Sequence, residues 1–233
     1  MKLNEAKKLA IIFLNLDIKP SEVGDLIVYH PFIKTPFLMD EKGIFNALDT
    51  PERWKEYKNK FKADVIEKCD SIEQLLFFVG ENYRLTFLKY LLHDDIVTIQ
   101  ECGNLLAKQW LILENINHDA NVKKTEVLEW IKCADKNILM GDRDLEIYSN
   151  LGEEIVIYRG CSRHGNKNGS SWTIDKKVAD WFARRFLKDG EYGRVYTAKV
   201  RKKNIIAYLD TKEKEVIVDW RGVFDVKMER VRR

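Results

Sequence analysis

The chain is poor in the residues that build disulfide-bonded or metal-centred proteins. Its 233 residues include 4 cysteines, 4 histidines and 4 prolines. The cysteines are scattered without a C-x-x-C pair or any zinc-ligand spacing, and the histidines form no ligand pair with one another or with a cysteine. We therefore expect no metal. Without a disulfide pattern, a reducing cytoplasmic location is favoured over an extracellular one.

Long apolar runs are missing as well. A membrane-spanning helix needs about 20 consecutive apolar residues, and no stretch of the chain approaches that length. The start, MKLNEAKKLAIIFLNL, has a basic beginning and a short apolar run, but Glu5 precedes that run and Asp17 closes it. No small-residue cleavage site follows, so this segment is typical of an amphipathic first helix rather than a signal peptide. No membrane partner is expected.

Neither sign of charge dominates. The chain has 40 Lys and Arg residues against 37 Asp and Glu residues, for a formal net charge of +3. That balance does not require a nucleic acid as partner, although it permits one. The 45% hydrophobic and 33% charged composition is typical of a soluble globular protein that buries a core. The length allows one large domain or two small ones.

The first part of the chain has the apolar spacing of helices. Thr50-Pro51-Glu52 and Asp70-Ser71-Ile72-Glu73 are good helix starts, and Asp94-Asp95 is expected to begin the longest helix. Residues 20–22 are expected to form a short turn of helix, and residues 30–43 an irregular segment. The expected helices cover residues 4–16, 51–61, 71–77, 82–92, 95–116 and 122–134, and the segment 82–92 either continues the helix before it or forms a separate one.

A change of composition divides the chain. The run Gly141-Asp142-Arg143-Asp144 interrupts the helical pattern, and β-branched and aromatic residues become frequent after it. We therefore expect a helical N-terminal region over residues 1–145 and a second domain over residues 146–233. No functional motif identifies the role of the first region. Target recognition, inhibitor binding and simple completion of the fold all stay open.

The second domain is expected to be mostly β-structure with one helix. Asp175 is a suitable N-cap for a helix over residues 176–188. Six short strands and one helix favour an α+β domain built on two small packed sheets. The expected strands cover residues 155–159, 170–174, 194–200, 204–209, 215–220 and 223–230.

Three short segments of this domain are candidates for a joint site. Arg159 ends an apolar run, Ser171-Trp172-Thr173 leads into the helix, and Glu213-Lys214-Glu215 leads into another apolar run. Taken singly, each is typical of ordinary structure: a solvated charge, a helix cap and a charged turn. Their combination in this order points to chemistry.

The chemistry follows from the residue types. Alternation along a strand places residues i and i+2 on one face, so Ser171 and Thr173 are expected to point the same way, as are Glu213 and Glu215. Two carboxylates on one face repel each other and give a purely structural sequence no benefit. A catalyst can use one to stabilise positive charge on a sugar carbon and the other to orient a nucleophile. Arg159 offers a planar fork for phosphate oxygens. The pattern indicates a phosphorylated sugar with a good leaving group as substrate.

This ordered set of residues resembles the Arg/Ser/Glu class of mono-ADP-ribosyltransferases, in its compact bacterial and phage forms, over about residues 153–233. The phrases YRG, SWT and EVIVD carry the resemblance. It implies a split two-sheet β core with one main helix, and NAD as the co-substrate. It further implies that Arg159 grips the NAD phosphates, that the Gly160 backbone approaches nicotinamide, and that Trp172 and Thr173 belong to the NAD-binding segment beside Ser171.

The resemblance also implies catalytic roles. Ser171 would orient Glu215, and Glu215 would stabilise the oxocarbenium-like transition state. Glu213 would position the acceptor, which favours a protein arginine. The basic tail from Lys227 to Arg233 leaves nucleic acid, RNA or DNA, open as an alternative acceptor. A catalytically inactive binding module and a structural interaction protein with coincidental motifs are further alternatives. An intracellular toxin in a phage or toxin–antitoxin setting, with a cognate antitoxin or inhibitor as partner, is the role that the resemblance suggests.

Overall fold

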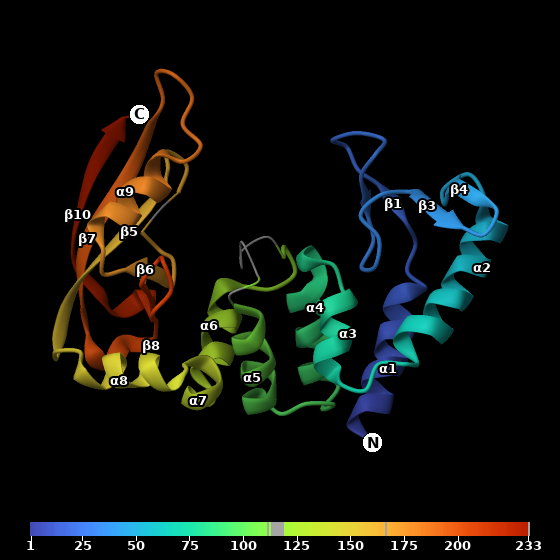
Figure 1. Ribbon diagram of the computed structural model, residues 1–233, viewed down its shortest axis with the longest axis horizontal. Helices are drawn as coiled ribbons and strands as arrows, with labels where there is room; N and C mark the ends of the chain where they lie inside the picture. Colours follow the sequence, from blue (N-terminus) through green and yellow to red (C-terminus); the bar gives the residue numbers. More distant parts are fainter. Residues whose placement is uncertain (111, 113–118, 166, 233) are drawn as a thin grey trace. The chain divides into compact units, whose positions relative to one another are not determined.

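The computed structural model describes residues 1–110, 112, 119–165 and 167–232, and these form an α+β protein (Figure 1). The chain divides into two compact units, Met1–Trp130 and Ile131–Arg233. The division lies at Trp130–Ile131 rather than at residue 145. The Gly141 break that suggested the later boundary separates two helices of the same unit, α7 (Lys136–Leu139) and α8 (Asp142–Asn150).

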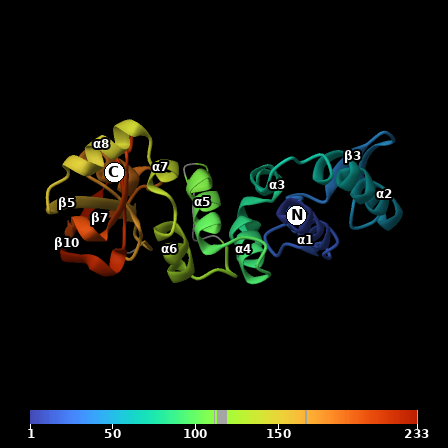
Figure 2. The ribbon, with the colours of Figure 1, turned by 90° about the horizontal axis from the view of Figure 1, so that it is seen from below.

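The segment before the sheet belongs to the C-terminal unit because its side chains pack on that sheet. Ile147 and Tyr148 of α8, together with Leu151, pack against the core of the sheet. The Tyr148 hydroxyl donates a hydrogen bond to the carbonyl of Ile205 at 3.2 Å. Figures 1 and 2 show α8 lying across one end of the sheet.

The N-terminal unit is mostly helical, as expected. Its core is formed by fully buried leucines and Phe87. A π-helical turn at Lys62–Ile66 continues α2, and α6 crosses the division between the units. The helices are α1 (Lys2–Leu14), α2 (Pro51–Phe61), α3 (Ile72–Phe78), α4 (Glu81–His93), α5 (Ile99–Trp110) and α6 (Lys124–Lys132).

Two of the three expected helix starts are confirmed. Thr50 is the N-cap of α2, and the Ser71 hydroxyl caps α3 by accepting a hydrogen bond from the Gln74 backbone N–H at 3.2 Å. The start at Asp94-Asp95 is wrong. Thr98 and Glu101 instead exchange hydrogen bonds of 2.8 and 3.2 Å, which is a capping box at the beginning of α5. The expected extension of this helix beyond Trp110 falls largely outside the described residues.

Short strands replace the helical turn expected at residues 20–22 and the irregular segment at 30–43. Strands β1 (Lys19–Pro20) and β2 (Val28–Tyr29) pair with each other, as do β3 (Phe37–Asp40) and β4 (Gly43–Asn46). Gly43 has φ +101°, a conformation that favours glycine in the tight turn between β3 and β4. Strands of two to four residues are too short to show a periodic pattern.

The C-terminal unit contains a six-stranded antiparallel sheet with the order β10-β7-β5-β6-β9-β8. Helix α9 (Lys176–Arg184) connects β6 to β7 and ends earlier than the expected residue 188. The strands are β5 (Glu154–Ser162), β6 (Ser171–Thr173), β7 (Tyr192–Arg201), β8 (Ile205–Leu209), β9 (Glu215–Val218) and β10 (Val223–Arg232). All six agree with the expected strands to within a few residues.

The two packed sheets expected from the sequence are a single sheet, in which only one pair of residues joins β5 to β6. Strands β10, β7 and β5 pair along most of their lengths, and so do β6, β9 and β8. Between β5 and β6, in contrast, the described ladder consists of one pair, Tyr158 with Thr173. The described ladder does not continue beyond this pair, and we call the unpaired stretch between Arg159 and Ser171 the opening of the sheet.

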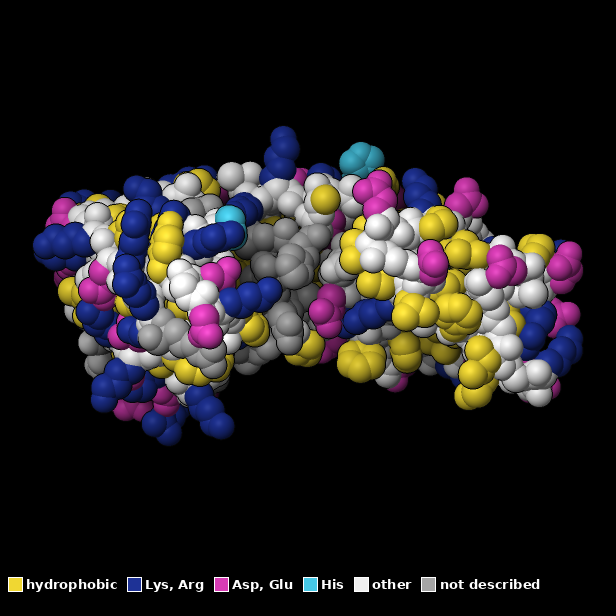
Figure 3. All heavy atoms as spheres, turned by 90° about the horizontal axis from the view of Figure 1, so that it is seen from above, with side chains coloured by type: hydrophobic (Ala, Val, Ile, Leu, Met, Phe, Trp, Pro, Cys, Tyr) yellow, Lys and Arg dark blue, Asp and Glu magenta, His cyan; other side chains and the backbone are white. Residues whose placement is uncertain are grey.

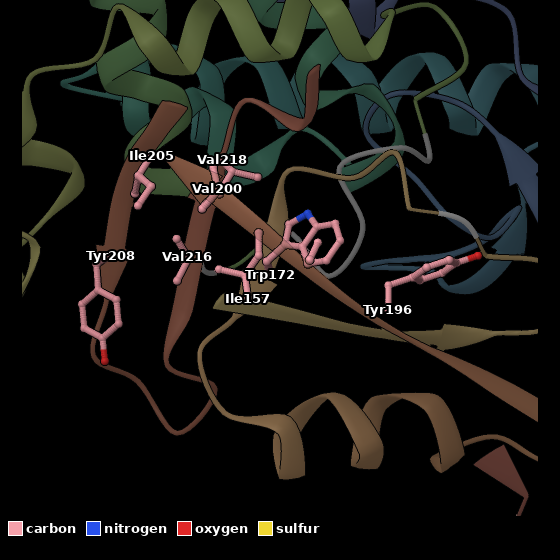
Figure 4. Packing of buried hydrophobic residues seen from close by; sticks show 9 residues of the cluster. Ile157, Trp172, Tyr196, Val200, Ile205, Tyr208, Val216 and Val218 are labelled. Atoms are coloured by element: carbon pink, nitrogen blue, oxygen red, sulfur yellow. The ribbon is translucent and has the colours of Figure 1, made fainter. Parts of the chain in front are cut away.

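Different groups of residues pack on the two faces of the sheet. One face carries a large core with Ile157, Trp172 and Val216, shown in Figure 4. The other face packs against α9 through Ala179 and Ala183. We call these the core face and the α9 face.

Glycine makes the contact between α9 and the sheet possible. A Cβ atom on Gly160 would lie 1.7 Å from the carbonyl oxygen of Ala179, and one on Gly193 would lie 2.0 Å from that of Ala183. The backbone of α9 therefore approaches β5 and β7 too closely for any side chain at these two positions.

Candidate active site

The opening between β5 and β6 holds the guanidinium of Arg159. Its Nη1 donates a hydrogen bond to the backbone carbonyl of Ser171 at 2.5 Å. Gly169 is buried against the same guanidinium, because a Cβ atom there would lie 2.4 Å from Cζ of Arg159. Arg159 is therefore fixed by the loop that leads into β6, and the two positions from the sequence motif, 159 and 171, are in contact.

The charge of Glu215 also affects the pKa of Arg159. Burial lowers the pKa of Arg159, while Cys161, Glu215 and Tyr196 act in the opposite direction. An arginine keeps its proton even so. The strand pairing agrees with this influence, because Tyr158, next to Arg159, pairs with Thr173, and Thr173 pairs with Glu215.

Glu215 is the first residue of β9 and is 7% exposed. It lies opposite Thr173 on β6, and Ser171 lies opposite Ile217, two positions further along. Alternation therefore directs Ser171, Thr173 and Glu215 to the same face of the sheet. For Ser171 and Thr173, this is the arrangement expected from the sequence.

Glu213 does not share a strand with Glu215. It lies in the turn before β9, and Lys214 between them has φ +45°, in the left-handed region. The strand alternation expected for the two glutamates does not apply to such a turn. The side chain of Glu213 is exposed, whereas that of Glu215 is buried.

The turn that carries Glu213 is tied to the start of α9. The Thr173 hydroxyl donates a hydrogen bond to the Glu213 carbonyl at 2.7 Å and accepts one from the Asp175 backbone N–H at 3.0 Å. Lys214 forms an ion pair of 3.2 Å with Asp175. Thr173 thus positions the turn as well as the strand, and Glu213 is held at the surface beside the buried Glu215.

Two residues expected to contact NAD have structural roles. The Trp172 ring is 2% exposed in the core of the sheet, and its Nε1 donates to the Gly169 carbonyl at 2.7 Å. Its side chain therefore packs in the core and does not line an open site. Gly160 is needed for the close packing of α9 described above. Neither role depends on a ligand.

The structure adds residues that the sequence did not indicate. Cys161 and Arg194 face each other on β5 and β7, on the face that also carries Arg159. Arg194 donates a hydrogen bond to the Gly165 carbonyl at 3.3 Å, and hydrogen bonding with tyrosines 192 and 196 raises its pKa. The alternation of tyrosine and arginine along β7 is the sequence signal that would have indicated this group.

The described residues contain no group of three or more His, Cys, Asp or Glu side chains that could hold a metal ion. In the same part of the chain, no helix has the length and apolar character to cross a membrane. No protein-family model, curated protein or solved structure matches this chain. The function is therefore argued from the geometry of the opening between β5 and β6.

Proposed function

We propose that the C-terminal unit transfers ADP-ribose from NAD to a macromolecular acceptor and releases nicotinamide. The observation that carries this proposal is the meeting of three residues at the opening between β5 and β6. Arg159 donates to the carbonyl of Ser171. The neighbouring Tyr158 is joined to Glu215 through Thr173 in the sheet. The single pair of residues that joins the two halves of the sheet supports a split-sheet arrangement like that of the Arg/Ser/Glu transferases.

The residues at the opening suit NAD. Arg159 is desolvated, and a guanidinium in such surroundings binds a diphosphate more strongly than one in water. The loop ending at Gly169 and Ser171 holds it in place, so little conformational entropy is lost when an anion binds. Arg159 would contact the NAD phosphates, and Ser171 would orient the carboxylate of Glu215.

The reaction exchanges one bond at the ribose for another. The bond between the ribose C1′ and the nicotinamide nitrogen breaks, and its electron pair leaves with nicotinamide, which becomes neutral. Glu215 stabilises the positive charge that develops on the ribose. A nucleophilic atom of the acceptor forms the new bond to C1′, and its proton is released to the solvent. Glu213, exposed in the adjacent turn, would orient the acceptor.

Replacement of Glu215 tests the site. We expect Glu215→Gln to lower nicotinamide release by about two orders of magnitude or more, because one electrostatic stabiliser of the transition state is lost. Glu153→Gln, which removes the same charge from an exposed position, is the matched control. Release of nicotinamide from NAD is measured with purified protein, with and without lysate. Full activity of the Glu215 variant would refute the site, and an inactive wild type would favour a binding module.

The role of Glu213 is tested by comparing two reactions. Glu213→Gln is expected to reduce transfer to the acceptor more than hydrolysis of NAD, because water needs less orientation than a macromolecule. Equal losses in both reactions would contradict an acceptor-orienting role. Two acceptor classes are considered: a protein arginine, which the resemblance favours, and a nucleic acid.

A further inference from the structure

One face of the sheet collects arginines around the proposed site. Alternation along β5, β7 and β10 directs four arginines to the core face beyond the part covered by α8. The same face carries two tyrosines, of which Tyr196 is buried in the core and Tyr192 is half-buried. We call this surface the arginine face; its members are Arg159, Tyr192, Arg194, Tyr196, Arg230 and Arg232. Figure 3 shows Lys and Arg side chains crowded over this unit, at the left of the view.

Along β10, the arginines and the glutamate point to opposite faces of the sheet. Glu229 points to the α9 face, where it forms an ion pair of 2.7 Å with Lys176. Lys227 has the same direction, because it pairs with Thr197 and Glu229 pairs with Val195. At the positions of β5, β7 and β10 that form the arginine face, the described residues include no carboxylate. Arg194, Arg230 and Arg232 therefore lie on one face without a carboxylate among their neighbours on that face of these strands.

This arrangement has an energetic cost that the fold does not require. Arg230 lies directly opposite Arg194 on the neighbouring strand, and like charges in that relation destabilise a sheet. Within the described residues, the buried Nε of Arg194 has no hydrogen-bond partner. An anion on this face would reduce the repulsion.

The half-buried ring of Tyr192 indicates which kind of anion this face would bind. The Arg230 guanidinium lies 4.7 Å from the centre of the Tyr192 ring, and Arg232 is the cross-strand partner of Tyr192. Planar guanidinium groups and aromatic rings together bind phosphates and stack on bases, which is how single strands are held without sequence preference. An acidic protein surface could bind to the arginines alone, so the aromatic ring beside them favours a nucleic acid.

We propose that the arginine face binds single-stranded nucleic acid and presents it as the acceptor to the opening where Arg159 lies. Arg159 lies on the arginine face and contacts Ser171 across the opening, whereas Ser171 and Glu215 point to the α9 face. The bound strand would therefore reach the proposed catalytic carboxylate through the opening. The acceptor assignment rests on the proposed function. The binding itself does not, and it can be tested separately.

The first experiment measures binding of a fluorescein-labelled 20-nucleotide RNA, and of DNA of the same sequence, by anisotropy between 50 and 300 mM salt. Each phosphate contact to a single strand contributes about −0.7 to the slope of log K against log salt. The double variant Arg230→Gln/Arg232→Gln is expected to bind about tenfold more weakly at low salt, with a slope smaller in magnitude by about 1.4.

The matched control is Lys203→Gln/Lys227→Gln, which removes two exposed charges from the same unit outside the arginine face. It is expected to keep the wild-type slope. Equal effects of the two double variants would reduce the interaction to general charge and overturn the proposal, as would weak, salt-independent binding by the wild type. Wild-type nicotinamide release by the arginine variant in the absence of nucleic acid supports the proposal. A raised KM for NAD instead would show that these arginines serve the NAD phosphates.

The second experiment identifies the acceptor with labelled NAD and whole lysate. Label that is lost on nuclease treatment but kept after protease treatment supports a nucleic-acid acceptor, and protease-sensitive label overturns it. If NAD is not cleaved at all while the anisotropy result holds, the proposed function fails and the binding face stands. If NAD is cleaved and the RNA and DNA do not bind, the inference fails and the proposed function stands.

Discussion

At the scale of single residues, the site depends on contacts that chain order does not reveal. The sequence indicated Arg159, Ser171, Thr173 and Glu215, because short-range alternation and a known motif place them. It did not indicate Gly169, because the role of this glycine comes from the guanidinium packed against it. The position of Glu213 was also unpredictable, since nothing in the sequence requires a lysine to adopt the left-handed conformation seen at 214.

Substitution of Gly169 provides a prediction at this scale. Gly169→Ala is expected to displace the Arg159 side chain and to weaken NAD binding about tenfold or more, since the added Cβ would overlap the guanidinium. The thermal stabilisation of the protein by millimolar NAD measures the effect. Gly152→Ala is a suitable control, because its Cβ would lie at an ordinary 3.6 Å from the carbonyl oxygen of Glu154. Unchanged NAD stabilisation in the Gly169 variant would show that Arg159 is not a phosphate ligand.

At the scale of secondary structure, alternation and helical spacing predicted the C-terminal strands and α9 well. The reason is that each strand has enough β-branched and aromatic residues to show its period. The strands β1 to β4 were missed because two to four residues are too few to show the alternation of a strand. The single pair between β5 and β6 was not predictable either, since the pairing of distant strands is decided by tertiary packing.

The start of α9 gives a prediction at the element scale. The Asp175 carboxylate accepts a hydrogen bond from the Lys177 backbone N–H at 2.9 Å and pairs with Lys214, and these contacts lower its pKa. Asp175→Ala should lower the melting temperature and reduce acceptor transfer more than NAD hydrolysis, because the cap and the tie to the Glu213 turn are both lost. Asp175→Asn keeps the cap and should retain most of the stability. Identical melting curves for wild type and the Ala variant would contradict this role.

At the scale of the whole molecule, a buried histidine makes the stability of the N-terminal unit depend on pH. His30 is buried in the N-terminal unit, where Nδ1 accepts a hydrogen bond from the Phe32 backbone N–H and Nε2 is 3.3 Å from the Leu14 carbonyl. Burial lowers its pKa from 6.5 to about 4. The unfolded chain therefore binds this proton more readily than the folded one, so the stability that depends on neutral His30 is full above pH 6.5 and falls as the pH drops towards 4.

We expect the N-terminal unit to lose about 2 kcal/mol of stability between pH 7 and pH 5 from this histidine. Urea denaturation at the two pH values measures the loss. His30→Gln should show a smaller decrease over the same interval, whatever its stability at pH 7. His93→Gln, at an exposed position, should retain the wild-type pH dependence. A pH dependence that is the same in all three proteins would exclude His30 as its source.

The position of β10 at the end of the sheet order has a consequence for self-association. Its ten residues are mostly exposed, and in the described part of the chain no strand pairs with its outer side. Such an edge is a template for a strand from another copy. The register shift at Asp225, which has φ +51°, and the charged side chains that follow oppose that docking. Neutralising Arg230 and Arg232 should therefore make the protein more prone to form aggregates at high concentration, which sedimentation would reveal.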